Sequence, residues 1–221
     1  MFERYAIYYT FDGALGAAGA QWLGWDIAGG AVLAPTRDVT QRPRKYGFHA
    51  TIKAPFHLTP SESETDLKAA FAHLCGALSP VTLDGLEQQN IGRFCALTIK
   101  GQDGAIKHLA ATTVRALDRF RAPLSNEDRT RRLKARLSPE QIENVHKWGY
   151  PHVMEQFQFH VTLTGPLKAA QADDIQRALA RIFTPLLPRP FEIAHLTLAG
   201  QRADGFFEQI LRLPLTGAGP S

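Results

Sequence analysis

The chain has 221 residues, of which 44% are hydrophobic and 21% charged, and its formal net charge is +4 at pH 7. This composition is typical of a folded globular protein and excludes a disordered, collagen-like or coiled-coil chain. Two cysteines are too few for a disulfide framework, and the sequence offers no signal peptide or membrane span, so we expect a cytoplasmic protein.

Hydrophobic patterns predict strands and helices along the whole chain. Strand-like runs cover residues 4–10, 81–87, 94–100, 191–199 and 206–213. Helical patterns cover residues 14–25, 65–78, 106–120 and 172–183. A further short helix begins at Ser138, since Ser138, Pro139 and Gln141 are the residues of a capping signal. This mixture predicts an α+β protein with mostly antiparallel strands.

One short segment occurs twice. Residues 46–56, YGFHATIKAPF, align without a gap on residues 157–167, FQFHVTLTGPL. A predicted helix and two predicted strands follow each copy. We therefore expect one domain over residues 1–221 that contains two repeats, 42–101 and 153–214, joined by a helical, basic segment at 104–150. The repeats predict two pseudo-symmetric lobes of small antiparallel sheets, with helices on the outside and a cleft between the lobes.

Strand alternation divides each copy into an apolar face and a polar face. The polar face carries His49, Thr51 and Lys53 in the first copy. In the second copy it carries His160 and Thr162. A single strand histidine is more often structural than catalytic, but a core does not require the same His and Thr twice. The duplication therefore favours a catalytic pair.

Two imidazoles and two hydroxyls in one cleft suit the hydrolysis of a phosphate diester. Histidine titrates near neutral pH, so His49 and His160 can serve as base and acid in either order. The hydroxyls of Thr51 and Thr162 can donate to phosphate oxygens, and Lys53 can offset negative charge. Tyr8, on a predicted strand, is a further candidate for lining the cleft. This chemistry requires no metal.

Other features of the sequence are less specific. Residues 115–136 contain eight cations against three acids, a density that can attract phosphates but is also typical of a solvated surface. Within this stretch, Arg129, Arg131 and Arg132 have weak periodicity and are expected in a loop. The remaining histidines lack metal-site spacing, and the glycine-rich runs lack P-loop or dinucleotide spacing. We therefore expect no metal and no cofactor.

The double His-x-Thr-x motif resembles the two-histidine (2H) phosphoesterase superfamily. The run at 4–8 also resembles the first strand of that superfamily, and the strings at 45–56, 148–151 and 157–166 are similar to a bacterial branch described as phosphonate metabolism proteins. The resemblance implies a two-lobed α+β fold with a central cleft, and metal-independent hydrolysis of cyclic phosphodiesters. By position, His49 and His160 match the catalytic pair, and Thr51 and Thr162 match the phosphate-binding hydroxyls.

Several alternatives stay open at this stage. The substrate is either a cyclic sugar phosphate, such as a ribose cyclic phosphate linked to phosphonate breakdown, or a 2′,3′-cyclic phosphate on a nucleotide or an RNA end. A rival function is a binding module that recognises a nucleotide or RNA end in the same cleft without turnover. Ligation of RNA ends by the reverse reaction is a third. We expect a monomer that acts on a small phosphorylated substrate, without a membrane partner.

Overall fold

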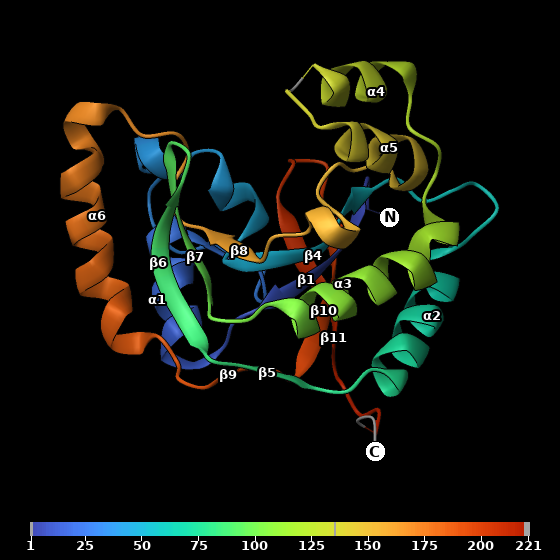
Figure 1. Cartoon of the computed structure of the whole chain (residues 1–221), viewed down its shortest axis with the longest axis horizontal. Coiled ribbons are helices and arrows are strands. Elements are labelled where there is room, and N and C mark those ends of the chain that lie inside the picture. Colours follow the sequence, from blue (N-terminus) through green and yellow to red (C-terminus); the bar gives the residue numbers. More distant parts are fainter. Residues whose placement is uncertain (1, 135, 219–221) are drawn as a thin grey trace.

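A seven-stranded antiparallel sheet with the order β11-β10-β1-β4-β8-β7-β6 forms the centre of the computed structural model, which describes residues 2–134 and 136–218 (Figure 1). Its strands are β1 (Tyr5–Thr10), β4 (His49–Phe56), β6 (Gly85–Ile91), β7 (Phe94–Lys100), β8 (His160–Thr162), β10 (His195–Gln201) and β11 (Phe207–Pro214). Two small sheets pair β2 (Trp25–Asp26) with β3 (Ala31–Val32), and β5 (Val81–Leu83) with β9 (Phe191–Ile193). The predicted α+β class with antiparallel strands is confirmed.

The described residues also form six α-helices. They are α1 (Gly13–Leu23), α2 (Glu64–Ala77), α3 (Gly104–Leu117), α4 (Asn126–Leu133), α5 (Pro139–Trp148) and α6 (Ala169–Phe183). In Figure 1, α6 lies at the left of the molecule, α2 and α3 lie at the right, and α4 and α5 lie together at the top. No helix in this described part of the chain has both the length and the apolar character needed to cross a membrane.

The two halves of the chain interlock within the central sheet. The hairpin β6–β7 comes from the first half, yet β7 pairs with β8 of the second half. The hairpin β10–β11 comes from the second half, yet β10 pairs with β1, which pairs with β4 of the first half. The two lobes are thus the two ends of one sheet. This exchange makes the two motif strands, β4 and β8, direct neighbours at its centre.

In both repeats the strand expected directly after the helix is broken at the matching place. The strand expected over 81–87 is divided at Asp84 into β5 and β6, and the strand expected over 191–199 is divided at Ala194 into β9 and β10. The first pieces, β5 and β9, pair with each other. The second pieces enter the central sheet, so the break allows each half to contribute to both sheets.

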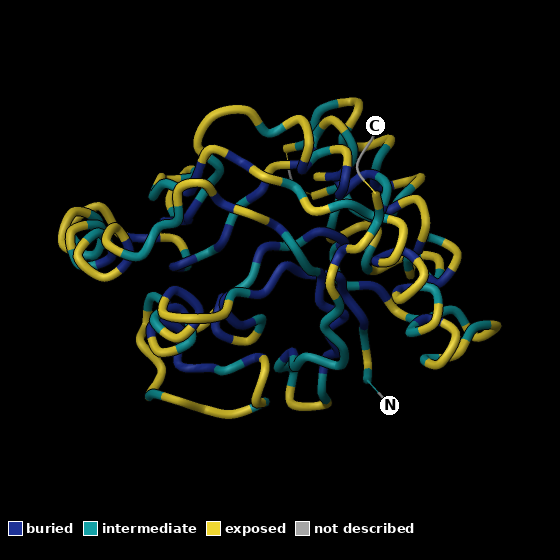
Figure 2. Tube along the Cα trace, turned by 90° about the horizontal axis from the view of Figure 1, so that it is seen from below, coloured by how far each residue is buried: buried dark blue, intermediate teal, exposed yellow. Residues whose placement is uncertain are grey.

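The apolar face of each motif strand is buried, as its alternation predicts. Ala50 and Val161 are fully buried and belong to the main hydrophobic core, together with Ile52 and Leu163. Figure 2 shows the strands in the middle of the molecule as largely buried and the outer helices as partly exposed. The opposite face of β4 and β8 is therefore left for polar side chains.

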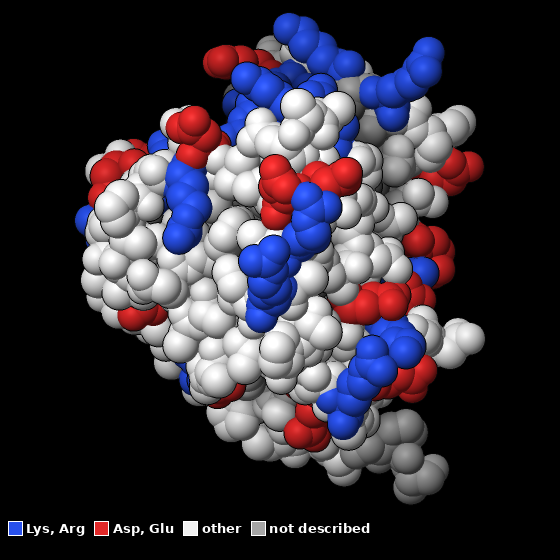
Figure 3. All heavy atoms as spheres, turned by 90° about the vertical axis from the view of Figure 1, so that its left-hand side faces the viewer, with Lys and Arg blue, Asp and Glu red and all other residues white. Residues whose placement is uncertain are grey.

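The helix at Ser138 is confirmed, but the loop expected around Arg131 is wrong. Ser138 Oγ accepts a hydrogen bond from Gln141 N–H at 3.3 Å, and Gln141 Oε1 accepts from Ser138 N–H at 3.0 Å. Residues Asn126–Leu133 form α4, which Ser125 caps by accepting from Asp128 N–H. This helix has no buried residue, so no apolar stripe marks it in the sequence. Figure 3 shows Lys and Arg side chains gathered at the top of the molecule, the end where Figure 1 labels α4.

Candidate active site

The four motif side chains meet where β4 pairs with β8. Ala50 lies opposite Val161 in this antiparallel pair. Continuing that register places His49 beside Thr162 and Thr51 beside His160, on the face opposite Ala50. Diagonal neighbours across such a pair lie ~7–8 Å apart, which is the spacing expected for the two histidines. A single sheet thus brings together the two His–Thr pairs predicted from the repeat.

Both imidazoles are oriented by the same main-chain contact. His49 Nδ1 lies 2.9 Å from the carbonyl oxygen of Gly47, and His160 Nδ1 lies 2.9 Å from that of Gln158. Because a carbonyl can only accept, Nδ1 carries the proton in each ring. Nε2 is then the atom that can accept or donate a proton in the reaction. In His49, Nε2 lies 3.1 Å from Thr51 Oγ1.

His49 is held in its neutral form by its surroundings. Its ring lies against the ring of the fully buried Tyr8, with 3.9 Å between the centroids. Burial lowers the pKa of His49 to about 4; the Gly47 carbonyl opposes this effect and the charge of His160 adds to it. At neutral pH the His49 imidazole therefore carries no proton on Nε2.

A cavity of about 820 Å³ opens beside His49. Thr162 and Thr164 contribute to its wall, and Arg42, Lys45 and Tyr46 line it from the segment before β4. No group of three or more His, Cys, Asp or Glu side chains suited to a metal ion occurs in residues 2–134 or 136–218. No carboxylate is among the described residues that line the cavity. Its charged side chains are therefore cationic, which suits an anionic substrate.

The structure places Lys53 away from His49. The register between β1 and β4 shifts between Ile7 and Tyr8, so that Tyr8 lies opposite Thr51 while Ile7 lies opposite Lys53. The simple alternation used to place Lys53 with the histidine does not continue through this irregularity. Lys53 is buried, and its Nζ lies 3.0 Å from a carboxylate oxygen of Asp118, just after α3. A phosphate contact by Lys53 stays a prediction.

Tyr8 is the closest aromatic neighbour of His49, but its side chain is buried behind the histidine ring. Its hydroxyl is also buried and has no hydrogen-bond partner among the described atoms. Tyr8 therefore shapes the environment of His49, while direct contact with a substrate stays a prediction.

Two residues at the site were not singled out from the sequence. Tyr46 lines the His49 cavity and precedes the motif by three residues, inside the string that carries the family resemblance. Thr98 lies opposite His160 on β7, and its buried hydroxyl has no partner among the described atoms. The sequence does not indicate that Thr98 is close to His160, because β7 and β8 belong to different halves of the chain. Only the pairing of the two strands brings these residues together.

Residues 51–208 match a family described as "Protein of unknown function (DUF1045)". Two relatives carry the name "Ribose 1,5-bisphosphate phosphokinase PhnN". The protein from Janthinobacterium sp. (strain Marseille) is 33% identical over 98% of this chain and 51% of its own length. The protein from Laribacter hongkongensis (strain HLHK9) is 30% identical over 86% of this chain and 46% of its own length. The chain thus spans about half the length of these relatives.

Two solved structures are similar over nearly the whole chain. TT0787 of Thermus thermophilus has 13% identity and a TM-score of 0.49, covering 98% of this chain and 100% of its own. E. coli LigT complexed with 3′-AMP has 14% identity and a TM-score of 0.49, covering 98% and 99%. Similarity at this level does not decide the activity, which must be argued from the residues of the site.

Proposed function

The chain belongs to this family of unknown function, and from its site we propose that it is a metal-independent phosphoesterase that hydrolyses a cyclic phosphodiester. The observation that supports the proposal most directly is the convergence of two matched His–Thr pairs on one face of β4 and β8. In both pairs the same type of main-chain carbonyl fixes the imidazole, with Nε2 as the reactive atom. Structural histidines do not require this duplication.

We assign His49 as the base and His160 as the acid. His49 is neutral at neutral pH, so Nε2 can take a proton from a water molecule as that water attacks phosphorus. The bond between phosphorus and the ring oxygen on the opposite side then breaks. His160 gives its proton to that oxygen. One water is consumed, and the cyclic diester becomes a phosphomonoester and a free hydroxyl.

The threonines are proposed to hold the phosphate during this step. In the free protein the Thr51 hydroxyl can donate to His49 Nε2, which lies 3.1 Å away. A bound phosphate oxygen would compete for that hydroxyl and leave Nε2 free for the attacking water. Thr162 lies beside His49 on the neighbouring strand and would donate to a second phosphate oxygen.

The names of the relatives point to the substrate. They are named for a kinase that acts on ribose 1,5-bisphosphate, and this chain matches only about half of each. The present sequence has no G-x-x-x-x-G-K-[S/T] run for binding ATP phosphates. We propose that it performs a neighbouring step: hydrolysis of the O2–P bond of 5-phosphoribose 1,2-cyclic phosphate, which yields ribose 1,5-bisphosphate.

The test is turnover of a substrate panel in the presence of EDTA. The panel contains 5-phosphoribose 1,2-cyclic phosphate, ribose 1,2-cyclic phosphate, 2′,3′-cyclic nucleotides and RNA with a cyclic phosphate end, with products followed by ³¹P NMR. We expect wild type to open the cyclic ribose phosphate and the double variant H49A/H160A to be inactive. Preferred turnover of nucleotides or RNA would reject the ribose substrate.

Tight binding of a nucleotide or RNA end without any turnover would instead support the binding module. Loss of activity with EDTA, restored by a divalent metal, would contradict the metal-independent mechanism.

A further inference from the structure

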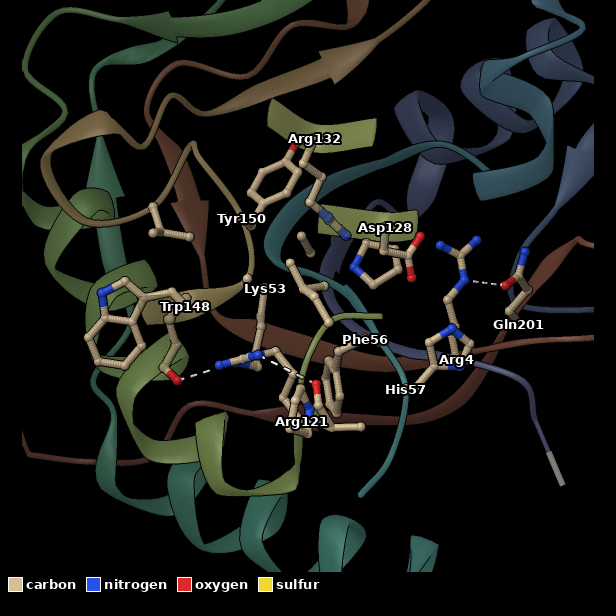
Figure 4. Close-up of a pocket in the computed structure, with 18 of the residues that line it drawn as sticks. Arg4, Lys53, Phe56, His57, Arg121, Asp128, Arg132, Trp148, Tyr150 and Gln201 are labelled. Atoms are coloured by element: carbon tan, nitrogen blue, oxygen red, sulfur yellow. Dashed lines mark hydrogen bonds between the residues drawn. The ribbon is translucent and has the colours of Figure 1, made fainter. Parts of the chain in front are cut away.

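A second cavity, of about 540 Å³, adjoins the His49 site, and Tyr46 lines both. Figure 4 shows its walls, which include Arg4 near the start of β1, the end of β4, α4, and Tyr150 after α5. These elements come from distant parts of the sequence. The cavity is therefore a product of the fold, which joins the end of the first motif to segments outside both repeat motifs.

Two of the cations that line this cavity have no carboxylate partner. Lys53 and Arg121 both form ion pairs with Asp118, and Arg131 pairs with Asp128. Neither Arg4 nor Arg132 lies within ion-pair distance of a carboxylate in the described part of the chain. The carboxylates of Glu3 and Asp128 also belong to the lining, and Asp128 is engaged by Arg131.

Arg4 and Arg132 are held in place by other contacts. Arg4 Nε donates to Gln201 Oε1 at 2.6 Å, which leaves its two terminal nitrogens available. The guanidinium of Arg132 lies 5.2 Å from the centroid of the Tyr150 ring, and its Nε is buried without a partner among the described atoms. Figure 4 shows both guanidinium groups directed into the cavity.

The Arg132 charge is poorly compensated in this place. Burial lowers the pKa of Arg132, and the charges of Arg131 and Arg4 add to the effect, although Tyr150 and Asp128 oppose it. Two like charges that share a partly buried space repel each other, and an anion between them would remove this cost.

Tyr8 contacts His49, and three groups that line the second cavity act on it electrostatically. One side of its ring contacts the His49 ring. Burial raises the pKa of Tyr8 well above its ordinary value, and Tyr46, Arg4 and Tyr150 are the groups whose charges act on it. Its ring lies against His49, and its buried hydroxyl has no hydrogen-bond partner among the described atoms.

We propose that this cavity binds a second phosphate of the substrate, a phosphomonoester dianion held by the guanidinium groups of Arg4 and Arg132. The inference rests on the proposed function, because it gives the substrate of the His49–His160 site two phosphates. In 5-phosphoribose 1,2-cyclic phosphate, the cyclic diester would lie at the histidines and the 5-phosphate between the two arginines. Arg–phosphate pairs of this type are strong, charge-assisted hydrogen bonds.

The kinetic test compares two substrates that differ only in this phosphate. Wild type is expected to have a kcat/KM at least ~100-fold higher for 5-phosphoribose 1,2-cyclic phosphate than for ribose 1,2-cyclic phosphate. Arg132→Gln and Arg4→Gln should each lower that ratio by ~10- to 100-fold. Arg129→Gln removes a charge from the same helix outside the cavity and should leave the ratio unchanged. An unchanged ratio in both cavity variants, with intact thermal melting, would overturn the proposal.

A binding measurement separates this inference from the proposed activity. Titration calorimetry with ribose 5-phosphate requires no turnover. Binding by wild type that weakens ~10-fold or more in Arg132→Gln would support the subsite even if no cyclic phosphate on the panel is hydrolysed. If the cyclic ribose phosphates are hydrolysed but ribose 5-phosphate binds equally to wild type and Arg132→Gln, the activity holds and the subsite is wrong.

Discussion

His49 and His160 occupy matching positions in the repeat and are fixed by the same contact at Nδ1, but their surroundings differ. His49 lies on a long central strand against the buried ring of Tyr8. His160 lies on a strand of 3 residues, and its nearest aromatic ring, that of Phe94, is 6.3 Å away between centroids. The motif therefore sets the orientation of each imidazole, while the neighbouring strands decide what packs against it, and burial lowers the pKa of His49. This difference in surroundings is the basis for the proposed assignment of His49 as the base and His160 as the acid.

The strongest test of this comparison replaces each histidine separately. His49→Gln and His160→Gln should each lower kcat/KM for the cyclic substrate by ~10²- to 10⁴-fold, because each removes a proton-transfer group. The two should differ on a diester with a p-nitrophenolate leaving group, which departs without a proton. There, His160→Gln should recover most of its activity and His49→Gln should not. The opposite pattern would make His160 the base.

The comparison extends to the fourth residue after each histidine, where Lys53 and Thr164 are both buried. Asp118→Asn removes the carboxylate that lies 3.0 Å from Lys53 Nζ and 2.9 Å from Arg121 Nε. Because two cations then lose their counter-charge in a largely buried place, we expect the free energy of unfolding to fall by about 3 kcal/mol.

Urea denaturation measures this loss. Asp174→Asn is the matched control, since the pair between Asp174 and Arg177 is exposed and should contribute about 0–1 kcal/mol. Equal effects of the two substitutions would show that the Lys53 charge is solvated.

The pH dependence tests the environment of His49. Since burial lowers the pKa of His49 to about 4, the base stays neutral, and the acid limb of kcat/KM should lie near pH 4 rather than near neutrality. Tyr8→Leu admits water to the ring, so this pKa should rise toward 6.5 and the limb should move up by ~1–2 pH units. Tyr8→Phe keeps the ring and should move it little. An acid limb of kcat/KM near pH 6.5 in wild type would contradict the proposed difference between His49 and His160.

The sequence predicted the parts of this site that repeat, and it missed those that depend on tertiary pairing. His49, Thr51, His160 and Thr162 could be found because the same four-residue pattern occurs twice. The pairing of β7 with β8 could not be predicted, since apolar alternation identifies a strand but does not identify the strand with which it pairs.

The other differences between the sequence predictions and the structure come from an irregular strand register and from charged residues that are distant in the sequence. A register shift between β1 and β4 moves Lys53 into an ion pair, and alternation carries no sign of such a shift. Helix α4 lacks an apolar stripe, and its termini are marked by Ser125 and by charges that suit the helix dipole. The approach of Arg4 to Arg132 depends on where that helix packs, which no local pattern records.

The smallest expected effect distinguishes Thr162 from Thr164, which lie two residues apart in the second motif. Thr164 is buried, and its Oγ1 accepts a hydrogen bond from Cys95 N–H at 3.0 Å. Thr164→Val leaves that buried N–H without its acceptor and should cost about 1–2 kcal/mol of unfolding free energy. Thr162→Val should leave stability within about 0.5 kcal/mol but lower kcat/KM ~10-fold, because Thr162 is half-buried beside the proposed phosphate position. Thermal melting and kinetics on the same two variants check both halves of the prediction. If Thr162→Val destabilises the protein as much as Thr164→Val and spares activity, then Thr162 is structural, and the equivalence of the two His–Thr pairs fails at its second member.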